Sequence, residues 1–382
     1  MALFSKTKSY LGVDFDSHSV KVVELKNEGG RPKLATYGYY DRDLDQLAET
    51  ADINKQENQE AAAKLIKDVC RQAKTTANKA VTSLPAYSVF SSILNLPPMP
   101  KKDLPSAVVW EAKKIVPLPV EEMILDWKLL EDGPEFQAEE KSVFTQSQAG
   151  AETNELGRKE FQKIESGSGK KHSKILLTAA AKDLVKRYMA IFKAAGLELL
   201  SLDTEPFALI RSLVGNDRSP AVIVDIGSVV SNLSVVVNGI PILSRSLDVG
   251  GLTITKAIAK SLNVSLSKAE QLKYDVGLSQ GQGGPGGVFK TIEQALAPIV
   301  DELKYSDFYK NQDQKSIEKI ILTGGSSQLL NLPEYLSGLL GVRVFLGDPW
   351  ARVIYPEELK PVLDEVGPRF AVAIGLAMRD IE

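Results

Sequence analysis

Two stretches of the chain, one near its start and one past its middle, can be laid over one another. They read GVDFDSHSVKVVEL and IVDIGSVVSNLSVV. In this overlay Asp14 meets Asp225, and Asp16 meets Gly227. Each copy is an apolar strand that ends in an aspartate, a short polar turn, and a second strand that leads away. A repeat of this kind in both halves predicts a duplicated α/β domain with a cleft between the copies.

The chemistry of the repeat favours a nucleotide site. Tight turns present successive backbone N–H groups, and such nests bind anions. Carboxylates at the two strand ends, Asp14 and Asp225, would hold Mg²⁺ through its waters, as this hard cation prefers. A nucleotide would lie between the two turns with its phosphates held from both sides. The alternative is a common turn sequence without a ligand, but two copies, each after an apolar strand, favour the site.

Three other segments fall where such a site needs them. Gly324 and Gly325 follow a predicted strand and precede a predicted helix, where glycine lets the backbone approach a base and ribose. Glu270 and Lys273 share one helical face and either bond the ribose and base or form a solvated ion pair. Glu205, before a proline at a predicted helix start, either orients a water near the terminal phosphate or is an ordinary acidic first turn.

Composition excludes several classes of protein. The chain has 382 residues, a length sufficient for two or more hydrophobic cores. Its net charge of -3 gives no reason to expect nucleic acid as a partner. A single cysteine, Cys70, rules out a disulfide framework and fits a reducing cytosol. The sequence contains no apolar run of about 20 residues, so we expect no helix that spans a membrane. Residues 131–173 are polar and predict a long hairpin tip or disordered loop, and the glycine-rich stretch 277–287 predicts flexibility.

The motifs and their order resemble the actin-like nucleotide-binding superfamily, which includes actin, Hsp70, sugar kinases and FtsA. The Asp14 and Asp225 turns resemble its two phosphate loops, the helix that begins at Glu205 resembles its first connecting helix, and Gly324–Gly325 resembles its adenosine loop. In detail the chain is similar to the PilM family of type IV pilus assembly. The matching stretches include YLGVDFDSHSVKVVEL, VWEAKKIVPLPVEEMILDW, DTEPFALIRSL, DVGGLTITKAIA, KAEQLK and ILTGGSSQLLNLPEYL.

The resemblance implies an actin-like (ribonuclease H-like, duplicated) α/β fold with an inserted small α+β subdomain of the 1C type. The boundaries we expect are subdomain 1A in 1–87, the 1C-like insert in 88–200, the connecting helix of 1A in 201–219, subdomain 2A in 220–255 and 318–382, and subdomain 2B in 256–317. It also implies ATP and Mg²⁺ as cofactors. Nucleotide-binding candidates are Asp14, Asp16, Ser17, His18, Ser19, Lys21, Asp225, Gly227, Ser228, Ser231, Gly250, Gly251, Glu270, Lys273, Gly324, Gly325 and Ser326, with Asp14 and Asp225 for the metal.

The resemblance further implies a cytoplasmic scaffold at the inner membrane. PilM-like proteins grip the N-terminal peptide of a PilN-type inner-membrane protein in a groove between subdomains 1A and 1C, and link the membrane platform to the cytoplasmic motor of twitching motility. They reach the membrane only through such partners. Apolar residues of the insert are candidates for the groove, with the core of the insert as the alternative: Val109, Trp110, Ile115 and Val116.

An active ATPase, a sugar-kinase relative or an FtsA-like cell-division protein are the alternatives, with Glu205 and Asp225 as catalytic residues if the site turns nucleotide over. No sugar-site signature is present. FtsA carries a C-terminal amphipathic helix after a linker, whereas this chain ends AVAIGLAMRDIE within what resembles the core fold. The sequence therefore favours the scaffold.

Two departures from the superfamily pattern point to weak nucleotide turnover. Asp16 stands where the first loop usually has glycine, and two like charges about 4 Å apart repel by roughly 4 kcal/mol at an effective dielectric constant of about 20. Lys21 or a metal ion could relieve this repulsion, Asp16 could itself become a metal ligand, or its side chain could point away. Val229 and Val230 replace small polar residues in the second loop. We expect weak or absent ATP hydrolysis.

Overall fold

The computed structural model describes residues 9–16, 18–42, 53–130, 173–279, 287–305 and 317–381. The chain divides into two compact units, and the smaller one, Val89–Leu184, is inserted into the larger one. The predictions for the polar segment and for the glycine-rich stretch fall almost entirely outside the described residues. Within the described residues, no helix combines the length and the apolar character needed to cross a membrane.

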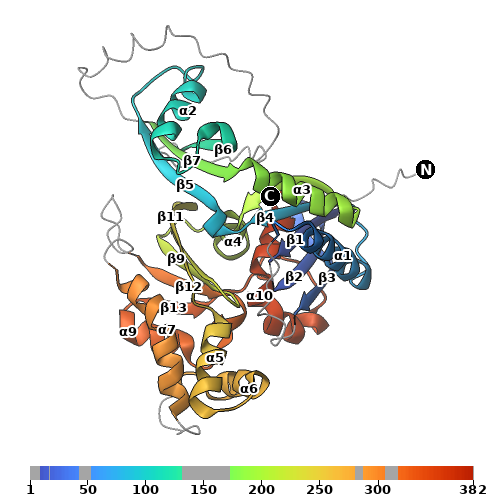
Figure 1. Ribbon diagram of the computed structural model, residues 1–382, viewed down its shortest axis with the longest axis vertical. Helices are drawn as coiled ribbons and strands as arrows, with labels where there is room; N and C mark the ends of the chain where they lie inside the picture. Colours follow the sequence, from blue (N-terminus) through green and yellow to red (C-terminus); the bar gives the residue numbers. More distant parts are fainter. Residues whose placement is uncertain are drawn as a thin grey trace. The chain divides into compact units, whose positions relative to one another are not determined.

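The first half of the larger unit is a five-stranded sheet with the order β3-β2-β1-β4-β8 (Figure 1). β1 and β2 form an antiparallel hairpin that β3 extends, whereas β4 and β8 continue the sheet parallel to β1. The carboxyl ends of parallel strands share one edge, so the turns after β1, β4 and β8 meet there. The elements are β1 (Ser9–Phe15), β2 (Ser19–Glu28), β3 (Arg31–Asp41), α1 (Gln56–Gln72), β4 (Lys79–Leu84) and β8 (Glu198–Thr204).

The second half repeats this sheet in the order β11-β10-β9-β12-β13, with the same strand directions. The turn Asn238–Gly239 joins β10 to β11. Both of its residues have positive φ, 55° and 75°, as a two-residue hairpin turn requires. The strands are β9 (Ala221–Ile226), β10 (Ser231–Val237), β11 (Ile240–Leu247), β12 (Lys319–Thr323) and β13 (Arg343–Leu346).

The two copies of the sequence repeat have the same strand register. Asp14 of β1 lies opposite Lys21 of β2, and Asp225 of β9 lies opposite Asn232 of β10. The predicted duplicated α/β fold is therefore confirmed down to the pairing of single residues. Both acidic strand ends lie at the edge where the parallel strands of their sheet terminate.

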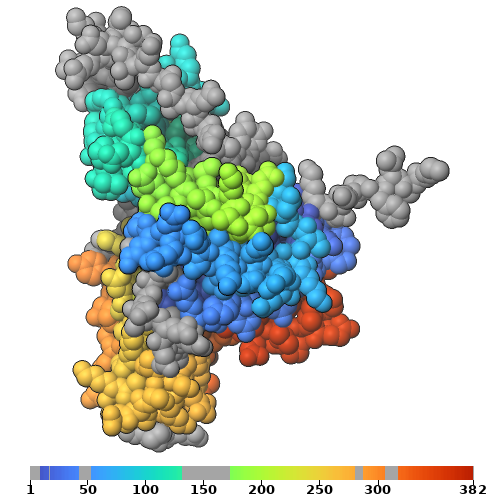
Figure 2. Space-filling model, turned by 45° about the vertical axis from the view of Figure 1, so that its right-hand side comes forward, coloured from blue at the N-terminus to red at the C-terminus, as the bar shows by residue number. Residues whose placement is uncertain are grey.

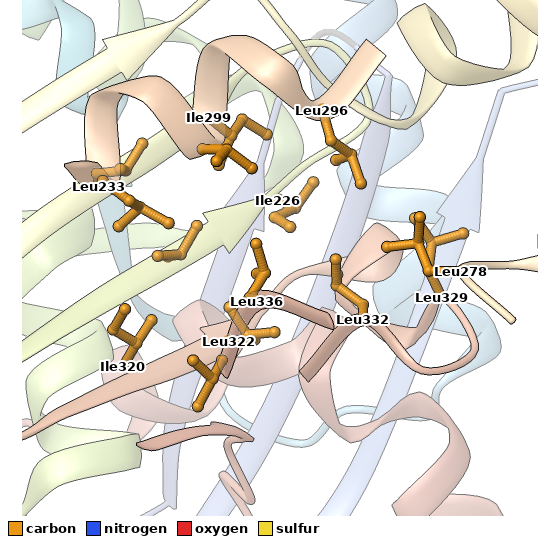
Figure 3. Close-up of a cluster of buried hydrophobic side chains, with 14 of the residues drawn as sticks. Ile226, Leu233, Leu278, Leu296, Ile299, Ile320, Leu322, Leu329, Leu332 and Leu336 are labelled. Atoms are coloured by element: carbon orange, nitrogen blue, oxygen red, sulfur yellow. The ribbon is translucent and has the colours of Figure 1, made fainter. Parts of the chain in front are cut away.

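Helices of the second half bury its sheet. Apolar side chains from the strands and helices interdigitate in one core, where Leu296 and Ile299 lie over Ile226 and Leu336 (Figure 3). Helical spacing of the apolar residues accounts for this face. The space-filling view shows the golden α5 and α6 at one end of the larger unit (Figure 2). The helices are α5 (Gly251–Leu262), α6 (Leu266–Val276), α7 (Val288–Lys304) and α9 (Leu332–Leu340).

Two helices connect the two sheets. α4 (Glu205–Leu209) continues into a π-helical turn (Ile210–Val214), and α10 (Lys360–Met378) packs against α4, β1 and β2. Their backbones approach closely: a Cβ on Gly375 would lie 1.8 Å from the carbonyl oxygen of Ala208. Glycine is required at this crossing because any side chain would separate the helices.

The inserted unit is a three-stranded antiparallel sheet in the order β5-β7-β6, with α2 packed on one face. Its core consists of alternate strand residues, such as Ile175 and Leu177 of β7, and of Leu104, Val108 and Ala112 of α2. The elements are η2 (Ala86–Ser88), which precedes the unit, β5 (Val89–Leu96), α2 (Leu104–Ile115), η3 (Val120–Glu122), β6 (Met123–Leu130), β7 (Ser173–Ala181) and α3 (Lys182–Ala195).

Two expected boundaries are wrong. The insert ends at Leu184 and not at residue 200, because β8 pairs with β4 and so belongs to the larger unit. After the Gly-Gly turn the chain forms a short 3-10 turn, Gly325–Gln328, and the helix begins only at Leu332. The proline that follows Leu332 suits the first turn of a helix, so the helix starts there and not directly after the glycines.

We predict that Gly375→Ala destabilises the protein by at least about 2 kcal/mol, because the methyl group forces α4 and α10 apart. Gly338→Ala is the matched control: this glycine lies within α9, nothing lies within 4 Å of its would-be Cβ, and alanine in a helix is favoured by about 0.5–1 kcal/mol. Urea unfolding followed by circular dichroism measures both. Equal midpoints for the two variants would contradict the close approach.

Candidate functional site

The first turn is filled by its own aspartate. Asp16 Oδ1 accepts the backbone N–H groups of His18 (2.6 Å) and Ser19 (2.8 Å), and Oδ2 accepts the Ser19 hydroxyl at 2.7 Å. Aspartate forms this local bond to N–H groups two and three residues ahead with little strain. The N–H groups that would receive a phosphate are therefore bonded to a carboxylate of the chain itself. Ser17 lies outside the described residues.

Lys21 neutralises part of this turn. Its Nζ lies 3.1 Å from Asp14 Oδ2, 3.6 Å from Asp16 Oδ2 and 2.7 Å from the hydroxyl of Ser19. Burial by itself would raise the pKa of Asp16, but Lys21 and the hydrogen bonds from Ser19 and His18 hold it below its ordinary value. Burial likewise opposes the charge on Lys21, yet Asp14 and Asp16 raise the pKa of Lys21. Asp16 is thus an ionised, bonded anion.

Two further carboxylates face the same cluster. Burial, followed by the charge of Asp14, raises the pKa of Asp225 to about 7. Burial, followed by the charges of Asp14 and Asp225, raises the pKa of Glu205 well above its ordinary value. We call Asp14, Asp16, Glu205 and Asp225 the carboxylate cluster. Asp14 and Asp225 lie near the carboxyl ends of β1 and β9, and Asp16 and Glu205 directly follow β1 and β8, which explains their convergence.

The second turn keeps the backbone of the first. Gly227 N donates to the carbonyl of Val230 at 3.1 Å, the counterpart of the 3.0 Å bond from Asp16 N to the carbonyl of Ser19. Ser228 is exposed, whereas Ser231 is buried and donates to the carbonyl of Val249 at 2.6 Å. Of the two candidate serines in this second turn, only Ser228 is thus accessible to a ligand.

The Gly-Gly turn packs directly against Asp225. A Cβ on Gly324 would lie 2.4 Å from Asp225 Oδ1, and Gly324 has a φ of +85°, so both space and conformation require glycine. Gly325, the next residue, is partly exposed. The buried Ser326 hydroxyl lies where a Cβ on Gly251 would be, at 2.1 Å. The two glycine pairs proposed from the sequence therefore lie side by side.

Glu270 and Lys273 form a buried pair and not a solvated one. Lys273 is 1% exposed, and its Nζ lies 2.7 and 2.8 Å from the two oxygens of Glu270. It also donates to Thr255 Oγ1 (3.1 Å) and to the carbonyl of Gly251 (3.4 Å). Burial lowers the pKa of Lys273, and Glu270 opposes this. Lys273 thus holds the start of α5, where Gly250 lies, and Glu270 retains a partly exposed carboxylate.

The described residues fit a magnesium ion better than they fit a phosphate. Asp14 and Asp16 together carry more negative charge than Lys21 offsets, which favours a divalent cation. Among the described residues no three His, Cys, Asp or Glu side chains are placed to hold a metal directly, so Asp14 and Asp225 would hold Mg²⁺ through waters. Bound there, the ion would supply positive charge beside the carboxyl groups of Asp14 and Asp225. The first phosphate loop is the part that does not fit, because Asp16 occupies it.

Three residues at the site were not predicted from the sequence. The side-chain amide of Asn232 donates to Glu205 Oε2 at 2.9 Å, and Asn232 could have been found because it aligns with Lys21 in the internal repeat. The hydroxyl of Tyr274 donates to the carbonyl of Gly325 at 3.4 Å, and the side chain of Arg369 would lie 3.7 Å from a Cβ on Gly325. No motif marks these two positions.

The proposed partner residues lie in the inserted unit, on and just after α2. Trp110 is 54% exposed, Val109 and Ile115 are also exposed, and Lys114 Nζ lies 3.3 Å from the centre of the Trp110 ring. Val116 instead packs against the core of the unit. The core alternative therefore holds for Val116 alone among the four residues.

Two five-stranded sheets of the same order, each with an acidic strand end in the same register, define an actin-like α/β protein. Structural neighbours support this class: the ethanolamine utilization protein EutJ from Carboxydothermus hydrogenoformans (14% identity, 98% and 91% of the two chains, TM-score 0.53) and MreB 5 of Spiroplasma citri bound to AMPPNP (12%, 97% and 95%, 0.50). The model of the type IV pilus assembly protein PilM matches residues 12–148 and 159–381. The chain therefore belongs to the PilM family.

A solved PilM-PilN type IV pilus biogenesis complex is similar over 98% of both chains, with 27% identity and a TM-score of 0.75. Among curated proteins the chain is similar to the cell division protein FtsA of Neisseria meningitidis, at 25% identity over 53% of each chain. It is also similar to FtsA of Agrobacterium fabrum, at 27% over 40% of this chain and 38% of the relative. The chain spans about half or less of the length of these curated relatives.

We predict that Asp225 makes the metal-free protein less stable as pH rises. The pKa of Asp225 is about 7 in the fold and about 3.9 when the chain is unfolded. As pH rises between these values, the unfolded chain loses the proton first, so the free energy of unfolding falls. The advantage of Asp225→Asn over wild type should grow from pH 5 to pH 8 in thermal melts with EDTA. Asp68→Asn, in an exposed pair with Arg71, should track wild type. An advantage that does not vary with pH would contradict the raised pKa.

Proposed function

We propose that the chain is a cytoplasmic scaffold of type IV pilus assembly that binds the N-terminal peptide of a PilN-type inner-membrane protein. The observation that carries the proposal is the similarity to the PilM-PilN complex, with 27% identity over 98% of both chains. In this role the protein would be attached to the inner membrane through its partner. It would link the membrane platform to the motor that drives twitching motility.

The exposed apolar residues of α2 support a peptide-binding role for the inserted unit. Trp110 is 54% exposed, and a large aromatic side chain at the surface is the usual anchor of a protein interface. Val109 and Ile115 supply apolar area beside it in the sequence. Lys114 covers the Trp110 ring through a cation–π contact, which a partner side chain could replace at modest cost.

Nucleotide has a secondary role in this proposal. The carboxylate cluster fits Mg²⁺ and would hold ATP as a structural or regulatory ligand. The Asp16 carboxylate accepts the N–H groups of His18 and Ser19, so these donors are taken from electrostatic stabilisation of a transferring phosphoryl group, the main catalytic device of such enzymes. This observation favours a scaffold over an ATPase.

We predict that a fluorescent peptide carrying the N-terminal residues of a PilN-type protein binds the purified chain in an anisotropy titration. Trp110→Ala should weaken binding at least about tenfold, as expected for an aromatic anchor. Tyr305→Ala, which removes another exposed aromatic ring at the end of α7, should leave the affinity unchanged. Failure of the folded wild-type protein to bind the peptide would refute the proposed function.

A further inference from the structure

Two segments of the larger unit that flank the inserted unit in the sequence contact the carboxylate cluster or a residue next to it. The unit begins at Val89, directly after η2, and it ends at Leu184, within α3. η2 contacts Glu205, and α3 contacts the residue that precedes Asp16. The two contacts arise from different parts of the larger unit.

The first crossing is bonded to Glu205. β4 and β8 are parallel neighbours whose last residues, Leu84 and Thr204, are paired. The chain that follows each strand therefore lies side by side, and the backbone N–H of Ala86 donates to Glu205 Oε2 at 3.1 Å. Glu205 is thus both a member of the carboxylate cluster and the acceptor that holds η2.

The same oxygen of Glu205 is shared with the second half of the unit. Asn232 Nδ2 donates to it at 2.9 Å, and the Ser246 hydroxyl donates to Asn232 Oδ1 at 2.7 Å. A carboxylate oxygen with two donors is sensitive to displacement, since hydrogen bonds weaken steeply once distance or angle departs from the optimum. A small movement of Glu205 toward a cation at the cluster would lengthen the bond from Ala86.

The second crossing is anchored by aromatic packing. Tyr188 of α3 is 2% exposed and meets Phe15 edge-on, with ring centroids 5.9 Å apart. Phe15 is the last residue of β1 and precedes Asp16. Phe15 therefore joins the first turn to α3 by direct contact between two rings.

We propose that Glu205 is a positioning residue that couples occupancy of the carboxylate cluster to the start of the inserted unit. A Mg²⁺-nucleotide at the cluster attracts Glu205, loosens its bond to Ala86 and so changes how η2 holds the chain that enters the unit. Where the inserted unit binds a partner peptide, which rests on the proposed function, nucleotide then modulates the affinity for that peptide. Coupling between two sites typically amounts to about 5–150-fold.

Amide hydrogen exchange at Ala86 in the full chain tests the coupling without the peptide. Exchange is measured in EDTA and in Mg²⁺ with saturating AMPPNP. In wild type, exchange at Ala86 should become at least fivefold faster on addition of the nucleotide. In Glu205→Gln, which keeps an acceptor but removes the charge, the change should fall below twofold. An unchanged rate at Ala86 in wild type overturns the proposal, whether or not AMPPNP binds.

Two further variants guard against a folding artefact. Ser246→Ala removes only the hydroxyl that orients Asn232, and it should reduce the exchange effect by about half or more. Glu198→Gln changes an exposed glutamate of β8 that pairs with Lys79, and it should behave as wild type. Equal exchange effects in Glu198→Gln, Ser246→Ala and Glu205→Gln would overturn the role of Glu205.

A parallel titration with the PilN-type peptide, with and without Mg²⁺-AMPPNP, separates the two proposals. Nucleotide should shift the peptide affinity of wild type at least fivefold and that of Glu205→Gln less than twofold. Peptide binding without any nucleotide effect would sink the coupling and leave the proposed function intact. An exchange effect at Ala86 in a protein that does not bind the peptide would refute the proposed function and leave the coupling to η2 standing.

Discussion

The carboxylate of Asp16, bonded to the N–H groups of His18 and Ser19, is the interaction on which the character of this site depends. A turn after a β-strand offers its N–H groups to whatever anion is nearest. Here the nearest anion is covalently part of the turn, so it is present at an effective concentration that no free nucleotide matches. Ser19 and Lys21 complete its coordination, and Lys21 is in turn bonded to Asp14. Both oxygens of the Asp16 carboxylate are therefore bonded within the chain.

The residues proposed for the nucleoside side of the site are held firmly by the fold. Gly324 is required against Asp225, and Lys273 is buried beneath the start of α5. A buried lysine is costly unless its charge is fully bonded, and Glu270, Thr255 and the carbonyl of Gly251 bond it. Together with the first turn filled by Asp16, this arrangement agrees with the proposed scaffold that holds a ligand for structure or regulation.

Much of this fold follows from the sequence, because the repeat is strong. Aligning Asp14 with Asp225 is enough to place both strand ends, both hairpins and the convergence of the cluster. The same alignment pairs Lys21 with Asn232, so even the missed partner of Glu205 was encoded there. The end of the insert was misjudged because the pairing of β8 with β4 is a contact between residues more than a hundred positions apart, which no local pattern reveals.

Side-chain states were the part that the sequence left open. Whether Asp16 points away, binds a metal or turns back on its own loop depends on the competing donors His18, Ser19 and Lys21, and these are fixed only by the hairpin register. Glu270 and Lys273 share a helical face whether they are solvated or buried. The packing of α6 against α5 is what buries Lys273 and its bond to Glu270. Likewise the exposure of Trp110 and the burial of Val116 depend on which face of α2 meets its sheet.

Titration calorimetry of Mg²⁺-ATP against Asp16→Gly tests the central claim most directly. If the Asp16 carboxylate occupies the phosphate donors, Asp16→Gly should bind Mg²⁺-ATP at least about tenfold more tightly than wild type, since one tenfold step needs only about 1.4 kcal/mol. Asp16→Asn, which removes the charge but keeps an oxygen for the two N–H groups, should gain clearly less. Equal affinities for Asp16→Gly and wild type would contradict the account.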